Sequence, residues 1–229
     1  IILNCLAESC GVSTPESIEA SLAIEVTSRQ QVATDYWTEL FLGNRTSVLI
    51  GTHANQQPPA ILFPGAFNPL HWGHERMAEI ASQRYGSPVT FELSITNVDK
   101  HPLDFIEIAD RLQQLAGRPV LLSRAPTFVE KSELAPGCLF VVGADTIARI
   151  ADSVYYNGDA SQRDAAIAAI ADRGCRFLVF GRTIDEGFNS LSAVPIPPPL
   201  RDICDEVPES EFKADVSSTE LRSNDRSGN

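Results

Sequence analysis

Basic residues are scarce in this chain of 229 residues. Eighteen lysines and arginines stand against thirty aspartates and glutamates, so the formal net charge is −12 at pH 7. A protein that follows a nucleic-acid backbone needs a broad basic surface. We therefore expect no nucleic-acid partner, and any basic patch has to be local, which favours a small anionic ligand.

Long apolar runs and paired cysteine spacings are also missing. No stretch approaches the ~20 apolar residues that span a bilayer, and no basic region followed by an apolar block opens the chain, so we expect no membrane association. The scattered cysteines favour free thiols in a reducing, cytoplasmic compartment, and those that border strand-like runs, Cys138 and Cys175, should be buried. The five cysteines are Cys5, Cys10, Cys138, Cys175 and Cys204.

Methionine occurs once, at Met77, and residue 1 is isoleucine. We therefore expect the chain to be a piece of a longer protein. Its length suits one substantial α/β domain with a smaller additional segment, because domains typically hold ~100–200 residues. Internal repeats and low-complexity tracts are absent from the sequence.

Histidine is rare as well, with four in the chain, yet two of them lie in the segment 65–74, GAFNPLHWGH. The apolar run 60–63 before it predicts a buried parallel strand, and 73–85 predicts a helix. A helix N-terminus attracts phosphate through its unpaired N–H groups and its dipole. His71 and His74 are three residues apart, so both rings can point toward one anion.

Three residues of this segment suit a tight loop around phosphate. Gly65 can adopt backbone angles closed to other residues, Asn68 before proline favours a turn, and Gly73 allows close approach of a ligand. A surface turn and a zinc site are the other interpretations of the two histidines. Zinc is set aside because no third ligand follows at a suitable spacing.

The segment 65–74 resembles the GxFxPxHxGH signature of the nucleotidylyltransferase superfamily, and the segment 216–222, VSSTELR, resembles the ISSTxIR motif of its adenylyltransferase branch. Taken alone, the second segment is also a plausible helix cap. The resemblance implies that His71, His74 and Arg222 are catalytic. It further implies nucleotide contacts by the residues of both motifs, namely Gly65, Ala66, Phe67, Asn68, Gly73, Ser217, Ser218 and Thr219.

A third segment lies between these two. The apolar run 139–142 predicts a buried strand, and Gly143-Ala144-Asp145 follows it before a helix over 147–151. In the superfamily a GxD element at this place holds the ribose, and ligands of open α/β sheets bind at the carboxyl ends of strands. We expect Gly143 and Asp145 to contact the nucleotide, with a helix N-cap at Asp145 as the alternative.

The remaining sequence alternates strand and helix patterns, which predicts a Rossmann-like, doubly wound parallel sheet with helices on both faces. We expect an irregular, proline-rich connection over 189–199. Further strands are expected at 88–95, 118–123, 175–181 and 211–216, and further helices at 103–116 and 162–173.

Residues beyond two other strands are candidates for the acceptor side. Asn97 and Lys100 follow the strand at 88–95, and Arg182 follows the strand at 175–181. Arg124, just beyond the strand at 118–123, is a weaker candidate for phosphate. Ordinary solvated loop and surface positions are the alternative for all four.

Residues 1–57 form a small, incomplete N-terminal α/β segment before the domain 58–229. Helices are expected at 17–25 and 30–42, a strand at 47–50 and a linker at 55–59. No catalytic constellation occurs here. The arrangement resembles the last part of a nicotinamide-nucleotide amidase domain of the competence-damage-inducible type.

The resemblance implies transfer of a nucleoside monophosphate to a phosphorylated acceptor with release of pyrophosphate. The 216–222 motif favours ATP and an acceptor such as nicotinamide or nicotinate mononucleotide. CTP with a phosphorylated alcohol and a non-catalytic nucleotide-binding module are the alternatives. Mg²⁺ should be carried by the triphosphate, with no dedicated metal ligands. Partners are then small-molecule substrates, and a homo-oligomer is left open.

Overall fold

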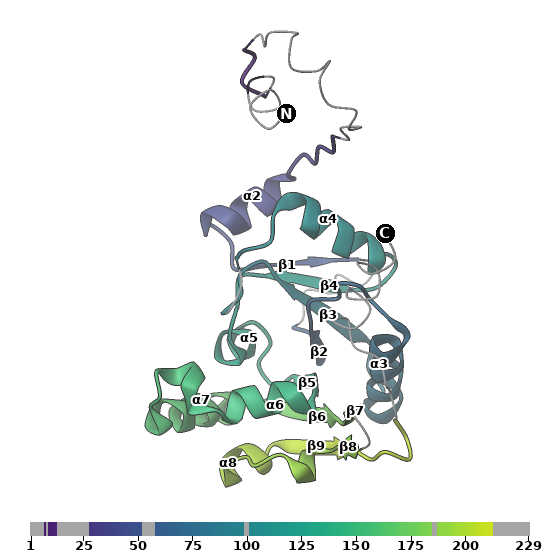
Figure 1. The fold of residues 1–229 in the computed structure, drawn as a ribbon, viewed down its shortest axis with the longest axis vertical. Helices are drawn as coiled ribbons and strands as arrows, with labels where there is room; N and C mark the ends of the chain where they lie inside the picture. Colours follow the sequence, from purple (N-terminus) through teal and green to yellow (C-terminus); the bar gives the residue numbers. More distant parts are fainter. Residues whose placement is uncertain are drawn as a thin grey trace, which may run out of the picture. The chain divides into compact units, whose positions relative to one another are not determined.

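The computed structural model describes residues 7, 9–12, 28–51, 58–98, 101–184 and 187–212. Contacts divide the chain into two compact units, residues 1–31 and residues 32–229. The fold described below is that of the second unit (Figure 1). The helix expected at 17–25 lies outside the described residues.

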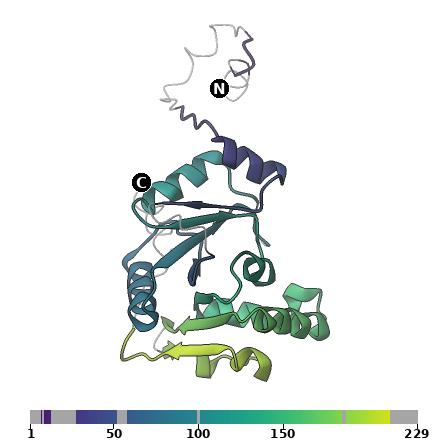
Figure 2. The same ribbon diagram turned by 180° about the vertical axis from the view of Figure 1, so that it is seen from behind.

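A seven-stranded sheet forms the centre of this unit, in the order β1-β4-β3-β2-β5-β6-β9. The last six strands in this order pair in parallel, and β1 pairs antiparallel with β4 at one edge. Figure 2 shows β9 at the opposite edge, beside β6. The strands are β1 (Ser47–Ile50), β2 (Ile61–Pro64), β3 (Val89–Ser94), β4 (Val120–Ser123), β5 (Leu139–Gly143), β6 (Arg176–Phe180) and β9 (Cys204–Val207).

Helices cover both faces of the sheet, as the sequence predicts. Alternate residues of one strand enter different cores: Leu62 packs with α6 and α7, whereas Ile61 and Phe63 pack with α3. The helices are α2 (Asp35–Leu42), α3 (Trp72–Tyr85), α4 (Phe105–Gln114), α5 (Phe128–Leu134), α6 (Ala144–Ala151), α7 (Ala160–Asp172) and α8 (Pro198–Arg201), with 3₁₀ turns η2 (Ser153–Tyr156) and η3 (Leu191–Ala193).

The order of the parallel strands creates a switch point between β2 and β5. From β2 the chain moves outward through β3 to β4, and it then returns to β5 and moves the other way through β6 to β9. Numbered along the chain, the parallel strands lie as 3-2-1-4-5-6, the order of doubly wound nucleotide-binding sheets. Ligands of such sheets bind beyond the carboxyl ends of the two strands at the switch point.

The segment 35–50 is part of this sheet and its core. Ser47 to Ile50 pair with Val120 to Ser123 of β4, and Trp37 and Leu40 of α2 are buried against α4 and β4. The contact division falls after Gln31, whereas the sequence analysis placed the boundary after residue 57. Helix α2 also begins at Asp35 rather than at residue 30, because Thr34 is extended.

The C-terminal part differs most from the sequence analysis. The last described strand of the sheet is β9 at Cys204–Val207, whereas a strand was expected at 211–216. Glu211 and Phe212 form a turn, and residues 213–216 lie outside the described part. Helix α5 and a two-stranded hairpin, β7 (Arg182–Ile184) and β8 (Gly187–Asn189), were not expected. The region 189–199 is irregular only at 190 and 194–197, because β8 ends at Asn189, η3 occupies 191–193 and α8 begins at Pro198.

Candidate functional site

The loop between β2 and α3 is shaped by a buried aromatic ring. Phe67 is 1% exposed and adopts a φ of +44°, an uncommon conformation for a residue with a side chain. A Cβ at Gly65 would lie 2.5 Å from the Phe67 ring. Gly65 is therefore needed for close packing, and the positive φ expected at Gly65 occurs at Phe67 instead.

The same loop is tied to its surroundings through its main chain. The Gly65 N–H donates to the Glu92 carbonyl at 3.0 Å, and the Leu70 N–H donates to the Gln114 side chain at 2.8 Å. Asn68 and Pro69 form the expected turn, and the peptide bond between them is cis. The Phe67 ring lies in the core, so a nucleotide can reach this residue only through its main chain.

The two histidines stack on each other where α3 begins. His71 is the N-cap, in extended backbone, and His74 is the third helical residue. Their ring centroids are 3.7 Å apart with an angle of 26° between the planes. The His71 N–H donates to Nδ1 of His74 at 3.3 Å. The predicted pairing of both rings at the helix N-terminus is present in the structure.

Both imidazoles are held in the neutral form. Burial, followed by the nearby His71 ring, lowers the pKa of His74 to about 3, and burial lowers the pKa of His71. The His74 ring lies against Phe63 and Phe67, with centroid distances of 5.9 and 5.2 Å. Apolar rings cannot stabilise an imidazolium as water does, so the charged form is disfavoured.

The hydrogen bond to His74 also assigns its tautomer. Because Nδ1 of His74 accepts from a backbone N–H, the proton of the neutral ring has to be on Nε2. Nε2–H is then a fixed donor. For His71, Nδ1 is buried and has no hydrogen-bond partner among the described residues.

Gly143 and Asp145 lie at the carboxyl end of β5, the other strand at the switch point. Gly143 is the N-cap of α6, so the alternative of an N-cap at Asp145 is wrong. Asp145 is in the first turn of this helix and is exposed. Because β2 and β5 pair in parallel, the N-termini of α3 and α6 lie at the same edge of the sheet. The structure thus brings Gly143 and Asp145 to the edge that holds the histidine pair.

The acceptor candidates are only partly described. Asn97 is exposed in the loop after β3, the strand beside β2. Arg182 begins β7, and its side chain lies outside the description. The third acceptor candidate, Lys100, lies outside the described residues. The same holds for the expected nucleotide contacts of the second motif and for the expected catalytic arginine, namely Ser217, Ser218, Thr219 and Arg222.

Arg124 is used in the structure to close a helix. Its Nη1 donates to the carbonyls of Leu40 and Phe41 at 2.8 and 2.9 Å, at the C-terminal end of α2. Cationic side chains stabilise that end of a helix. This contact accounts for the arginine after β4 without a phosphate.

Sequence reasoning missed a buried charged cluster beside the site. Glu92 of β3 and Lys131 of α5 are 1% and 5% exposed and form an ion pair at 2.9 Å. The signal that marks it is the lone carboxylate in the strand VTFELS. Trp72, which follows His71, was also not singled out, although its side chain is 50% exposed beside the histidines.

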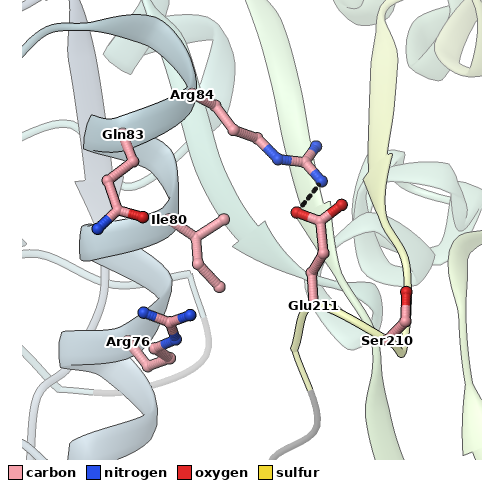
Figure 3. Close-up of a pocket in the computed structure, with 6 residues that line it drawn as sticks. All are labelled: Arg76, Ile80, Gln83, Arg84, Ser210 and Glu211. Atoms are coloured by element: carbon pink, nitrogen blue, oxygen red, sulfur yellow. Dashed lines mark hydrogen bonds and ion pairs between the residues drawn. The ribbon is translucent and has the colours of Figure 1, made fainter.

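A cavity of about 430 Å³ lies along α3 and the segment after β9 (Figure 3). Its arginines already have acidic partners: Arg84 contacts Glu211 at 2.6 Å, and Arg76 contacts Glu79 at 3.1 Å. Neither histidine lines it, so this cavity is separate from the histidine site. Its lining consists of Arg76, Ile80, Gln83, Arg84, Ser210 and Glu211.

The described residues contain no group of three or more histidine, cysteine, aspartate or glutamate side chains placed to hold a metal ion. Among them, no helix combines the length and the apolar character needed to cross a membrane.

The comparisons with known proteins agree with the fold. A family model described as cytidylyltransferase-like matches residues 62–224, a range that begins in β2 and contains both histidines. No curated protein matches the chain. Because the matched range covers well over half of the 229 residues, the chain belongs to the cytidylyltransferase-like family of the nucleotidylyltransferase superfamily.

Proposed function

We propose that this domain transfers AMP from ATP to a phosphorylated acceptor, such as nicotinamide or nicotinate mononucleotide, and releases pyrophosphate. Family membership supports nucleotidyl transfer in general. The observation that carries the proposal is the stacked pair of neutral histidines at the N-terminus of α3, beside the switch point of the sheet.

The proposed reaction is a direct displacement. A phosphate oxygen of the acceptor attacks the α-phosphorus of the triphosphate, and the bond to the bridging oxygen of the leaving pyrophosphate breaks. Such a step asks the protein mainly for alignment and stabilisation of charge. No covalent intermediate with the protein is needed.

The histidines suit this task as hydrogen-bond donors. Because His74 is neutral with its proton on Nε2, it can donate to a phosphate oxygen without losing a proton to solvent. The N–H groups at the start of α3 add a positive dipole end. We assign Arg222, Ser217, Ser218 and Thr219 to the departing phosphates, on the resemblance of their motif. Mg²⁺ would enter as part of the triphosphate substrate and neutralise phosphate charge.

The remaining contacts follow from the places of the loops. We assign Gly143 and Asp145 to the ribose side, since they lie at the carboxyl end of β5. Asn97, Lys100 and Arg182 are assigned to the acceptor, with the exposed position of Asn97 beyond β3 as support. A cytoplasmic, reducing compartment belongs to the proposal too, and the buried free thiols of Cys138 and Cys175 fit it.

Cytidylyl transfer is the second candidate. The description of the matched family favours it, whereas the segment VSSTELR favours ATP. Under this candidate, CTP and a phosphorylated alcohol replace ATP and the mononucleotide. The histidine pair would act in the same way.

A panel of substrate pairs tests the proposal. The purified chain is incubated with Mg²⁺, with ATP or CTP, and with nicotinamide mononucleotide, nicotinate mononucleotide or phosphorylated alcohols, and pyrophosphate release is measured. We expect release with ATP and a mononucleotide, and His74→Ala should lower the turnover number by about 10²–10³-fold. Gln83→Ala, on the same helix but in the separate cavity, is the matched control and should leave turnover unchanged.

Each other outcome has a distinct meaning. Release with CTP alone would replace the first candidate by the second. Silence with every pair would favour a non-catalytic nucleotide-binding module, and unchanged turnover of the His74→Ala variant would remove His74 from the mechanism.

A further inference from the structure

The buried pair of Glu92 and Lys131 connects the central sheet to α5. Glu92 is on β3, in register with Pro64 of β2 and Leu121 of β4. An unpaired carboxylate at this depth would be strongly destabilising. Lys131 prevents this, because its Nζ lies 2.9 Å from one carboxylate oxygen and 3.0 Å from the other.

Two more contacts complete the cluster. The Ser123 hydroxyl donates to the Glu92 carboxylate and accepts from the Ala125 N–H at 3.2 Å. Lys131 donates to the Ala125 carbonyl. Both polar groups of the Ala125 main chain are therefore held, and Ala125 is itself buried. The cluster thus fixes the start of the loop 124–127 at the carboxyl end of β4.

Glu92 holds the histidine loop as well, through its main chain. Its carbonyl accepts the Gly65 N–H at 3.0 Å, at the point where the chain leaves β2 toward His71. One residue therefore anchors two loops at the carboxyl edge of the sheet, one by its carbonyl and one by its carboxylate. The first loop follows β2 at the switch point, and the second follows β4, two strands away at the same edge.

Stability alone does not explain a charged pair in this place. Two charges lose their hydration on burial, and well-packed apolar side chains of similar volume often stabilise a protein as much or more. Apolar side chains cannot form directional hydrogen bonds. Lys131 donates to three acceptor atoms, and these bonds fix the relative position of β3, the end of β4 and α5.

We propose that Glu92 and Lys131 are positioning residues that hold the loops 65–71 and 124–127 in the geometry required for nucleotidyl transfer. The catalytic meaning of this pair rests on the proposed function. The positioning itself is measurable without substrates, as the rate at which backbone amides of the two loops exchange with solvent.

The test uses the full chain and a paired replacement, Glu92→Leu with Lys131→Met, which leaves no unpaired buried charge. We expect it to fold with a melting temperature near that of the wild type and to exchange the amides of 124–127 several-fold faster, because Lys131 no longer holds Ala125. The amides of 65–71 should also exchange faster, because β3 loses its tie to α5 and the Glu92 carbonyl that accepts from Gly65 is then less fixed. Its turnover number should fall by about 10–100-fold, as misplacement by a fraction of an ångström to an ångström can cause, with little change in the KM for the nucleotide.

The control is Glu133→Gln, on the same helix as Lys131. It breaks the exposed ion pair between Glu133 and Arg173. It should change neither loop exchange nor turnover. Should the paired replacement not fold, Ser123→Ala removes one donor to Glu92 and should speed exchange in 124–127 alone. The Lys131 contact would remain in that variant.

The outcomes separate the two proposals. Unchanged loop exchange in the paired replacement, or the same acceleration in Glu133→Gln, overturns the positioning role. Ser123→Ala with unchanged exchange overturns it when the paired replacement is unfolded. A wild-type chain that releases no pyrophosphate with any substrate pair overturns the proposed function instead, and loop exchange still decides the positioning role.

Discussion

The histidine pair shows how single residues acquire their properties from their neighbours. A free imidazole titrates near pH 6.5, but the Phe63 and Phe67 rings and the stacked His71 keep His74 neutral far below that value. A pair of imidazolium ions at 3.7 Å would repel each other, whereas two neutral rings can stack. Neutral donors also stay available over a wide range of pH.

This lowered pKa predicts how stability depends on pH. The unfolded chain binds a proton at His74 below about pH 6.5, while the folded chain does so only near the pKa of about 3. The contribution of His74 to the free energy of unfolding is therefore fully present above pH 6.5, and it is lost as pH falls from 6.5 toward 3. We expect the wild type to lose up to about 1.4 kcal/mol per pH unit relative to His74→Asn.

The measurement is urea unfolding of both chains at several values of pH between 7 and 4. Taking the difference between the chains removes the contribution of carboxylates, such as Asp159, whose pKa is lowered by the backbone N–H of Ser161 and of Gln162. Parallel curves for the two chains would mean that His74 is protonated as easily in the folded state as in the unfolded one.

For single residues, the sequence predicted which residues form the site better than it predicted why each one is there. The motif located His71 and His74, and the structure brings them together. It did not locate Glu92 or Lys131, because a strand and a helix that each carry one charge look ordinary until they are packed together. Gly65 was expected for its backbone angles, but the Phe67 ring is the reason for it.

Among the elements, α2 depends on a side chain far away in the sequence. The last turn of α2 leaves carbonyls without a full set of helical partners. Arg124 donates to those of Leu40 and Phe41, and the Leu40 carbonyl also accepts from the Gly43 N–H at 3.2 Å. Gly43 then ends the helix in a left-handed conformation with φ of +79°. The contact joins α2 to the carboxyl end of β4.

Replacing this arginine should therefore lower stability and spare catalysis. We expect Arg124→Met to reduce the free energy of unfolding by about 1–2 kcal/mol, since two charge-assisted hydrogen bonds are lost at a partly exposed site. Urea unfolding provides the value. Arg45→Met, which breaks only the exposed pair with Glu39, is the control and should cost less than about 1 kcal/mol.

Pyrophosphate release by the same variants decides the alternative interpretation of Arg124. If Arg124→Met loses turnover while its stability equals that of the wild type, the arginine contacts substrate phosphate and its helix contact is secondary.

Elements with apolar patterns were predictable, and polar ones were not. The strands β2, β3, β5 and β6 follow from their apolar runs. Strand β9 carries two carboxylates in four residues, and their partners within the protein come together only in the folded sheet. Asp205 pairs with Arg176 at 3.1 Å, and Glu206 accepts from the Leu191 N–H at 2.9 Å. A sequence pattern cannot show such partners.

For the whole second unit, the sheet extends beyond the range matched by the family model. That range begins at residue 62, yet β1 pairs along the full length of β4. Trp37 of α2 stacks on Phe105 of α4, with ring centroids 6.1 Å apart. The α/β order of the sheet was predictable from its motifs and apolar runs. The place of residues 35–50 was not, because a short helix and a four-residue strand look the same in a separate segment as in an extension of the sheet.

This extension predicts where the chain can be shortened. A chain of residues 32–229 keeps α2 and β1, whereas a chain of residues 58–229 exposes the edge of β4 and the apolar surface that Trp37 and Leu40 cover. Burial of one large apolar side chain contributes roughly 1.5–3 kcal/mol, so the shorter chain should be less stable by several kcal/mol.

An exposed edge strand also favours association between chains, so the shorter chain should aggregate more readily. Urea unfolding and size-exclusion chromatography of the two chains measure both effects. Equal stability and equal monodispersity would show that α2 and β1 are dispensable and that the domain begins at β2. A stable longer chain beside an aggregating shorter one would make residues 35–50 part of the minimal nucleotidyltransferase domain, because the sheet then depends on β1 to cover the edge of β4.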